Sequence, residues 1–128
     1  MYFVVDTHAF LWYLLNSPKL SSEARHCFDL IDNGKATMII PAIVLLECID
    51  ILDKKKVILD FEDIALKITQ ASNCIISEIN WGLILEINRV KGFSDIHDRV
   101  IVTVAKTFGA PLISRDKMIK SLYGKTIW

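Results

Sequence analysis

The sequence predicts an α/β fold, a three-layer α/β/α sandwich with a central, mainly parallel sheet. Short apolar, partly β-branched runs alternate along the chain with longer stretches whose apolar residues recur at helical spacing. This pattern is typical of parallel strands joined by right-handed helical crossovers. Hydrophobic residues make up 52% of the 128 residues, which suits a sheet that is buried on both faces. At this length we expect a single domain over residues 1–128.

Ordinary start and stop signals bound the predicted elements. Pro41 suits the first turn of a helix, Gly109 ends another, and residues 91–97 form a loop. The predicted strands are residues 2–5, 37–40, 74–76, 111–114 and 126–128. The predicted helices run from His8 to the break at 16–18, from Ser21 to Gly34, from Pro41 to the lysine run at 54–56, over 61–72, over 80–90, over 98–108, and onward from Asp116.

Four acidic residues stand far apart in the sequence, each where a strand and helix would deliver it to one edge of the sheet. They are Asp6, Glu47, Asp98 and Asp116, with Asp95 close to the third. Asp6 and Asp116 follow predicted strands, and open parallel sheets bind ligands beyond the carboxyl ends of their strands. Carboxylates gathered without matching cations repel one another, so a fold that collects them usually needs a divalent cation. The sequence therefore predicts a Mg²⁺ or Mn²⁺ site for phosphate chemistry.

The same acids have simpler structural explanations. An Asp between a strand and a helix is often only an N-cap, and this alternative applies to Asp6, Asp95 and Asp116. Glu47 interrupts an apolar helix, where a buried carboxylate is costly unless it is paired or bound to metal. A solvent-facing position is the alternative for Glu47. Asp50, three residues later, is either its neighbour or simply exposed.

The formal net charge is zero, but the charge is unevenly distributed. Residues 1–64 carry 6 Lys or Arg and 10 Asp or Glu, whereas residues 65–128 carry 9 and 5. The second half could therefore place a basic rim beside an acidic centre. Such a rim suits a nuclease better than a tight nonspecific DNA-binding protein, whose domain would be basic as a whole. Solvated charge on helix surfaces is the alternative for any single residue.

Cysteine usage and hydropathy point to a reducing, aqueous compartment. Cys27, Cys48 and Cys74 lie in apolar stretches without C-x-x-C spacing, so we interpret them as small buried hydrophobic residues and not as zinc ligands. The N-terminus lacks the basic region of a signal peptide, and the uncharged run at residues 36–46 is too short to span a bilayer. We expect a soluble cytoplasmic protein with no membrane partner.

Four segments carry a resemblance to a known family. They are DTHAFLW at 6–12, a mid-helix Glu47 after PAIVLL, DIHDRVIV at 95–102 and LISRD at 112–116. Together they resemble the PIN (PilT N-terminal) domain, and within it the VapC-like toxin ribonucleases of prokaryotic toxin–antitoxin pairs. The resemblance covers essentially the whole chain in the same order. Many relatives carry Pro and an aromatic residue between the two acids of the third motif, where this chain has Ile96 and His97.

The resemblance implies a Mg²⁺- or Mn²⁺-dependent endoribonuclease that is the toxin of a toxin–antitoxin pair. It therefore implies RNA as the substrate and a cognate antitoxin as a partner. The apolar composition additionally predicts a homodimer. The implied site consists of the metal-binding, catalytic acids Asp6, Glu47, Asp98 and Asp116, the auxiliary residues Asp95, Thr7 and Ser114, and the RNA-binding candidates Arg99, Arg115 and Lys117. For His8 and Trp12, which belong to a subgroup signature, packing or support of the site is favoured over direct catalysis. His97 and His26 are expected in ordinary roles, on a loop and on a helix surface.

Two other functions compete with this interpretation. A catalytically inactive PIN-like module that binds a partner protein through its apolar surface is the main alternative, although the intact set of acids disfavours it. A phosphoacceptor domain lacks support because the acids are not paired after the first strand and no well-placed Lys follows a late strand.

Overall fold

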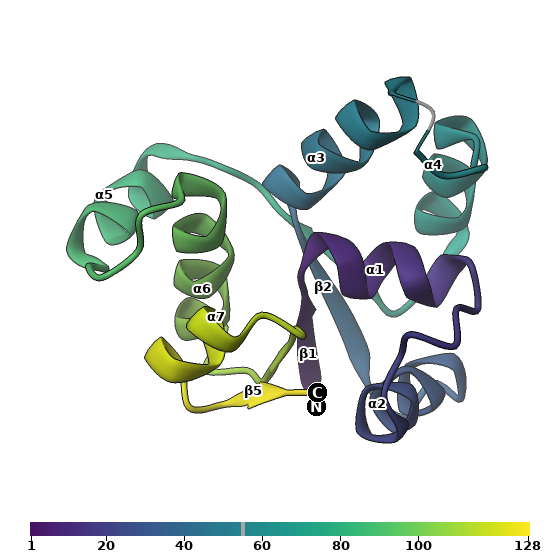
Figure 1. Ribbon diagram of the computed structural model, residues 1–128, viewed down its shortest axis with the longest axis horizontal. Coiled ribbons are helices and arrows are strands. Elements are labelled where there is room, and N and C mark those ends of the chain that lie inside the picture. The colour runs from purple at the N-terminus through teal and green to yellow at the C-terminus, as the bar shows by residue number, and fades with distance from the viewer. Residues whose placement is uncertain (55) are drawn as a thin grey trace.

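The computed structural model, which describes residues 1–54 and 56–128, has the predicted three-layer α/β/α fold (Figure 1). Over these residues the central sheet contains five parallel strands in the order β3-β2-β1-β4-β5. The strands are β1 (Tyr2–Val5), β2 (Thr37–Pro41), β3 (Cys74–Ser77), β4 (Leu112–Ile113) and β5 (Thr126–Ile127). The prediction of a parallel sheet between helical layers is confirmed.

Helices cover both faces of this sheet. In the view of Figure 1, α5, α6 and α7 lie to the left of β1 and β2, whereas α1, α2 and α4 lie to the right, and α3 continues from the end of β2. The helices of the described residues are α1 (Thr7–Leu14), α2 (Ser22–Asp32), α3 (Ala42–Asp53), α4 (Phe61–Gln70), α5 (Trp81–Arg89), α6 (Ile96–Phe108) and α7 (Lys117–Leu122).

The core is built around the central strand β1. Val4 pairs with Ile39 of β2 on one side and with Leu112 of β4 on the other, and all three side chains are fully buried. Helix α6 packs against β1 and β2 through a continuous buried stretch that includes Val100 and Val104. The apolar composition is therefore used largely in a sheet that is covered on both faces.

The pairing of β1 with β4 fixes the position of the later acids. The amide of Asp6 donates to the carbonyl of Ile113 at 3.2 Å, which extends the ladder by one step beyond β1. Because parallel strands end at the same edge of a sheet, the residues that follow β1 and β4 are neighbours in space. Segments that lie at opposite ends of the sequence thus meet at one edge.

Several predicted boundaries were wrong by a few residues. Pro41 is the last residue of β2 and the N-cap of α3, because its ψ of 137° is extended, so it does not lie in the first helical turn. Helix α6 begins at Ile96 and not at 98, because the side chain of Asp95 caps it. Helix α4 ends at Gln70, before Ala71, whose ψ of 134° is extended. Helix α3 ends at Asp53, and residue 55 of the predicted lysine run lies outside the described residues.

The burial of two cysteines agrees with their interpretation as small hydrophobic residues, whereas the third is only partly buried. Cys27 and Cys48 are buried, Cys74 is half-buried, and all three are free thiols. Within the described part of the chain, no helix is both long enough and apolar enough to cross a membrane.

Candidate active site

The ends of β1 and β4 deliver two of the predicted acids. Asp6 follows β1 and caps α1, with its Oδ1 accepting from the amide of Ala9 at 2.9 Å. Asp116 follows β4 and caps α7, accepting from the amides of Met118 and Ile119 at 2.8 and 3.1 Å. The capping alternative is therefore true for both residues. It does not exclude a second role, because both caps use Oδ1 and a carboxylate has two oxygens.

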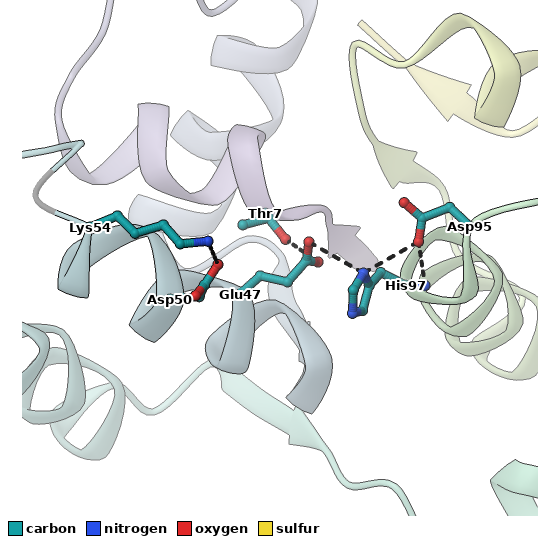
Figure 2. Close-up of polar contacts among 6 residues, drawn as sticks. All are labelled: Thr7, Glu47, Asp50, Lys54, Asp95 and His97. Carbon is teal, nitrogen blue, oxygen red and sulfur yellow. Dashed lines mark hydrogen bonds and ion pairs between the residues drawn. The ribbon is translucent and has the colours of Figure 1, made fainter.

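Glu47 comes from the middle of α3 and its carboxylate is held from two sides (Figure 2). The hydroxyl of Thr7, the first residue of α1, donates to Oε1 at 2.7 Å. The other oxygen, Oε2, lies 3.9 Å from Nδ1 of His97. With a side chain that is 31% exposed, Glu47 is neither buried nor turned to solvent. Asp50 is exposed and pairs with Lys54 at 2.8 Å, away from this contact.

The start of α6 contributes the third group of side chains. Asp95 is the N-cap, and its Oδ1 accepts from the backbone amide of His97 at 2.7 Å and lies 3.3 Å from Nδ1 of the same residue (Figure 2). Asp98 follows in the first helical turn. His97 was expected on a loop, but it stands in that turn between the carboxylates of Glu47 and Asp95.

Electrostatic coupling indicates that these acids share one environment. Burial raises the pKa of Asp98 to about 6, with further increases from the carboxylates of Asp95, Asp116, Glu47 and Asp6. Burial also raises the pKa of Asp6, against the lowering effect of hydrogen bonds from the Ser114 hydroxyl and the Ala9 amide. Neighbouring like charges and loss of water both disfavour the ionised form. Such perturbed acids are typical of functional sites, although structural clusters show them as well.

The acids line a single cleft of about 500 Å³. Its lining combines acidic, aromatic and basic side chains: Asp6, Thr7, His8, Trp12, Glu47, Asp95, Asp98, Ile101, Arg115 and Asp116. A second hollow of about 470 Å³, lined by apolar and polar residues of α1, α2, α4 and β2, contains none of the predicted site acids. The acids predicted from the sequence therefore lie along the first cleft and not in the second hollow.

The donor set of the cleft suits a hard divalent cation, because Mg²⁺ and Mn²⁺ prefer carboxylate oxygens. Within the described residues, however, no three His, Cys, Asp or Glu side chains are grouped closely enough to form a ready-made metal cluster. Mg²⁺ usually keeps several of its waters and takes only one or two carboxylates directly. The residues therefore fit an ion that the acids would hold in part through its bound waters.

The remaining predicted residues differ in how close they come to the acids. Thr7 and Arg115 line the cleft, whereas Ser114 is buried and does not line it. The Ser114 hydroxyl accepts from the amide of Asp116 at 3.1 Å. Arg99 donates to the carbonyls of Ile87 and Asn88 at the end of α5, which ties α5 to α6. Lys117 is exposed and does not line the cleft.

Two aromatic contacts of the cleft residue Trp12 were not predicted from the sequence. His8 and Trp12 lie one helical turn apart on α1, with ring centroids 5.5 Å from each other. Trp12 also contacts Trp128, with ring centroids at the same distance. The spacing of residues 8 and 12 indicated a common helix face, but nothing local in the sequence indicated the contact with Trp128.

The fold and the cleft define a PIN-type α/β domain, and comparison by sequence agrees. The PIN domain model matches residues 3–125, so the chain belongs to the PIN domain family, as the four sequence motifs predicted. No curated protein matches the chain.

Solved structures share this fold at low sequence identity. One is VapBC2 from Rickettsia felis bound to a promoter DNA fragment, with 15% identity, a TM-score of 0.67, and coverage of 99% of this chain and 96% of that one. A chain of a toxin–antitoxin complex from Klebsiella pneumoniae has 15% identity, a TM-score of 0.63, and coverage of 98% and 95%. A chain of FitAcB from Neisseria gonorrhoeae has 14% identity, a TM-score of 0.60, and coverage of 91% and 89%.

Proposed function

We propose that this chain, acting as one domain, is a divalent-metal-dependent endoribonuclease. The observation that carries the proposal is the meeting of acids from separate elements in one cleft, where their charges and burial together raise the pKa of Asp98. Members of the PIN family are generally nucleases, which are hydrolases that act on nucleic acids. A cleft with an acidic floor and a cationic residue at its margin suits a phosphodiester substrate.

The four acids Asp6, Glu47, Asp98 and Asp116 would hold Mg²⁺ or Mn²⁺. The chemistry that such an ion supplies is activation of water at neutral pH and neutralisation of charge on the phosphate. The chain fixes the ligands: Thr7 orients the carboxylate of Glu47 by a 2.7 Å hydrogen bond, and the amide of Ala9 holds Asp6. Arg115 at the cleft margin supplies positive charge toward the RNA backbone.

A direct test is RNA cleavage by the purified protein with Mn²⁺. Asp6→Asn and Asp98→Asn should abolish cleavage while leaving the fold intact, because Asn is as good an N-cap as Asp at position 6. Asp50→Asn is the matched control, since this acid lies on α3 but is exposed and pairs with Lys54. Cleavage that persists in excess chelator or in both cleft variants would contradict the proposal. Absence of divalent-ion binding by calorimetry, with a stable protein complex instead, would support an inactive PIN-like binding module.

We further propose that the enzyme is the toxin of a type II toxin–antitoxin pair. Support comes from the fold that it shares with chains of the Rickettsia felis and Klebsiella pneumoniae complexes. Expression of the chain should then arrest growth, and the product of a small neighbouring gene should bind the chain and relieve the arrest. Relief by an unrelated antitoxin, or arrest that survives in Asp98→Asn, would contradict this assignment.

A further inference from the structure

Trp12 stands at the junction between the acidic cleft and a group of aromatic and basic side chains. It lies on α1, is half-buried, and lines the same cleft as Asp6 and Asp116. The rings of His8 and Trp128 approach it at centroid distances of 5.5 Å with interplanar angles of 50° and 56°. Both neighbours are therefore tilted against the indole and not stacked flat upon it.

Flexible cations lie over the indole ring. The guanidinium carbon of Arg115 is 5.8 Å from the ring centroid, and the amine of Lys19 is 5.5 Å from it. Both residues are exposed. Contacts of this kind are weak at exposed sites, so a stronger partner can displace either side chain or enter between it and the ring. Arg115 also immediately precedes the cleft residue Asp116, which places a positive charge beside the acids.

Packing alone explains only part of this arrangement. Trp12 does pack against the hydrophobic core, as expected from the sequence. A structural tryptophan has no need for two exposed cations over its ring or for a position in an acidic cleft. An aromatic face flanked by cations is, in contrast, what unpaired nucleic-acid bases bind, because the base stacks on the ring and the adjacent phosphates attract the cations.

We infer that Trp12, with His8 and Trp128 beside it and Arg115 and Lys19 over its ring, is a nucleobase-binding subsite that stacks one unpaired base of the RNA next to the phosphate presented to the acids. This inference rests on the proposed function and adds to it a base-binding subsite beside the acids. In a duplex the bases are already stacked on one another, so the subsite selects unpaired segments.

The test measures binding of a fluorescein-labelled single-stranded RNA by anisotropy. All proteins carry Asp98→Asn so that the RNA is not consumed. Adding Trp12→Leu should weaken binding on the order of ten-fold, the loss typical of one base–aromatic stack. Tyr2→Leu is the matched control, because Tyr2 packs against Phe108 at the start of β1 and does not line the cleft. Equal affinity of the Trp12→Leu protein and its parent would overturn the inference.

An abasic scan separates stacking from a purely structural role. RNAs that each lack one base are compared between the Asp98→Asn parent and the same protein with Trp12→Leu. At one position, removal of the base should weaken binding to the parent by about the same factor as Trp12→Leu weakens binding of the intact RNA. The affinity of the Trp12→Leu protein should not change when that base is removed. A Trp12→Leu loss of the same size for every abasic RNA would overturn the inference, because it would reflect general damage to the surface.

Two further results separate this inference from the proposed function. If the chain with Asp98 intact does not cleave RNA but the stacking signature is found, the nuclease assignment fails and the subsite stands. If cleavage is normal but Trp12→Leu affects only binding of the antitoxin, Trp12 is a protein contact and the subsite is overturned. Circular dichroism of each variant confirms that the compared proteins are folded.

Discussion

Asp98 is the cleft acid whose ionised form is disfavoured both by burial and by neighbouring carboxylates. Its pKa is raised to about 6 in the folded protein, first by burial and then by four other carboxylates. The folded protein therefore binds the proton of Asp98 more tightly than the unfolded chain does. This favours the folded state fully below the unfolded-state pKa, and the contribution to stability is lost as the pH rises through about 6. Without divalent ions, we predict that Asp98→Asn increases the free energy of unfolding at pH 8 by about 1 kcal/mol, a value reduced for the partial exposure of the side chain.

Urea denaturation in EDTA at pH 5 and pH 8 checks this prediction. The gain from Asp98→Asn should shrink at pH 5, where the wild-type side chain is largely protonated when folded. Asp50→Asn is the control, because hydrogen bonding to Lys54 lowers the pKa of Asp50 and the substitution should give no gain at pH 8. A loss of stability at pH 8 in Asp98→Asn would contradict the charge-repulsion account.

Thr7 is predicted to orient Glu47 for metal binding. Its hydroxyl donates to Oε1 at 2.7 Å, so Thr7→Val leaves the carboxylate without this partner while keeping the side-chain volume. Loss of such a supporting hydrogen bond typically costs ten- to a hundred-fold in metal affinity, and we expect about ten-fold weaker Mn²⁺ binding by calorimetry. Thr7→Ser retains the hydroxyl and should bind Mn²⁺ nearly as the wild type does. Equal weakening in both variants would point to packing and not to the hydrogen bond.

At the scale of single residues, the sequence identified the candidate site residues well. It did not predict which other side chains these residues contact. The interruption of an apolar helix singled out Glu47, but its contact with Thr7 joins segments 40 residues apart, and local patterns carry no such information. His97 was misplaced on a loop. Asp95 had been recognised as a possible cap, and a cap at that position starts the helix early enough to contain His97.

At the scale of elements, α6 depends on its C-terminal glycine. Gly109 has a φ of 61°, and its amide and that of Ala110 close the helix by hydrogen bonds to the carbonyls of Lys106 and Ala105. A Cβ at this position would meet nothing within 4 Å, so the cost of Gly109→Ala is conformational and not steric. We predict a loss of about 1 kcal/mol in the free energy of unfolding, measured by urea denaturation.

Gly124→Ala is the matched control for this prediction. A Cβ at Gly124 also meets nothing within 4 Å, but Gly124 is not among the residues with positive φ. Its substitution should therefore be neutral or slightly stabilising, since Ala restricts the unfolded chain more than Gly does. Equal destabilisation by both substitutions would show that the left-handed conformation of Gly109 is not the cause.

Helices were easier to predict from the sequence than their ends and the strands. Helical periodicity and caps such as Ser21 and Asn80 located the helices, because those signals are local. Pro41 suited both the start of a helix and the end of a strand. The pairing of Pro41 with Ser77 of β3 decides in favour of the strand, and that pairing depends on tertiary contacts. Strand β4 consists of only two residues, too few to set its limits by pattern.

At the scale of the whole molecule, strand order was the information that the sequence lacked. Alternating elements predicted a parallel sheet, but they did not specify that β4 lies next to β1. That adjacency brings Asp116 beside Asp6, and it also places Arg115 over Trp12. The gathering of the acids was therefore anticipated as a consequence of the fold class, whereas the aromatic and basic side of the cleft required the structure.

The solvent face of α5 predicts self-association of the folded chain. Leu83 and Ile87 are buried, whereas Trp81, Ile84 and Leu85 of the same helix are exposed, Trp81 to 70%. Apolar stripes of this kind on a folded protein usually mark interaction sites. We predict that two copies pair through α5, so that light scattering coupled to gel filtration gives the mass of a dimer.

Substitutions on α5 test whether the dimer forms through this helix or through any exposed apolar side chain. Trp81→Glu combined with Leu85→Glu should yield a monomer, because each copy would lose apolar area and bring like charges together at the contact. The free energy of unfolding of the monomer should change little, since neither side chain belongs to the core. Leu66→Lys, which changes an exposed leucine on α4, should leave the dimer intact. A wild-type chain that is monomeric at every concentration, or a dimer that only Leu66→Lys disrupts, would contradict pairing through α5.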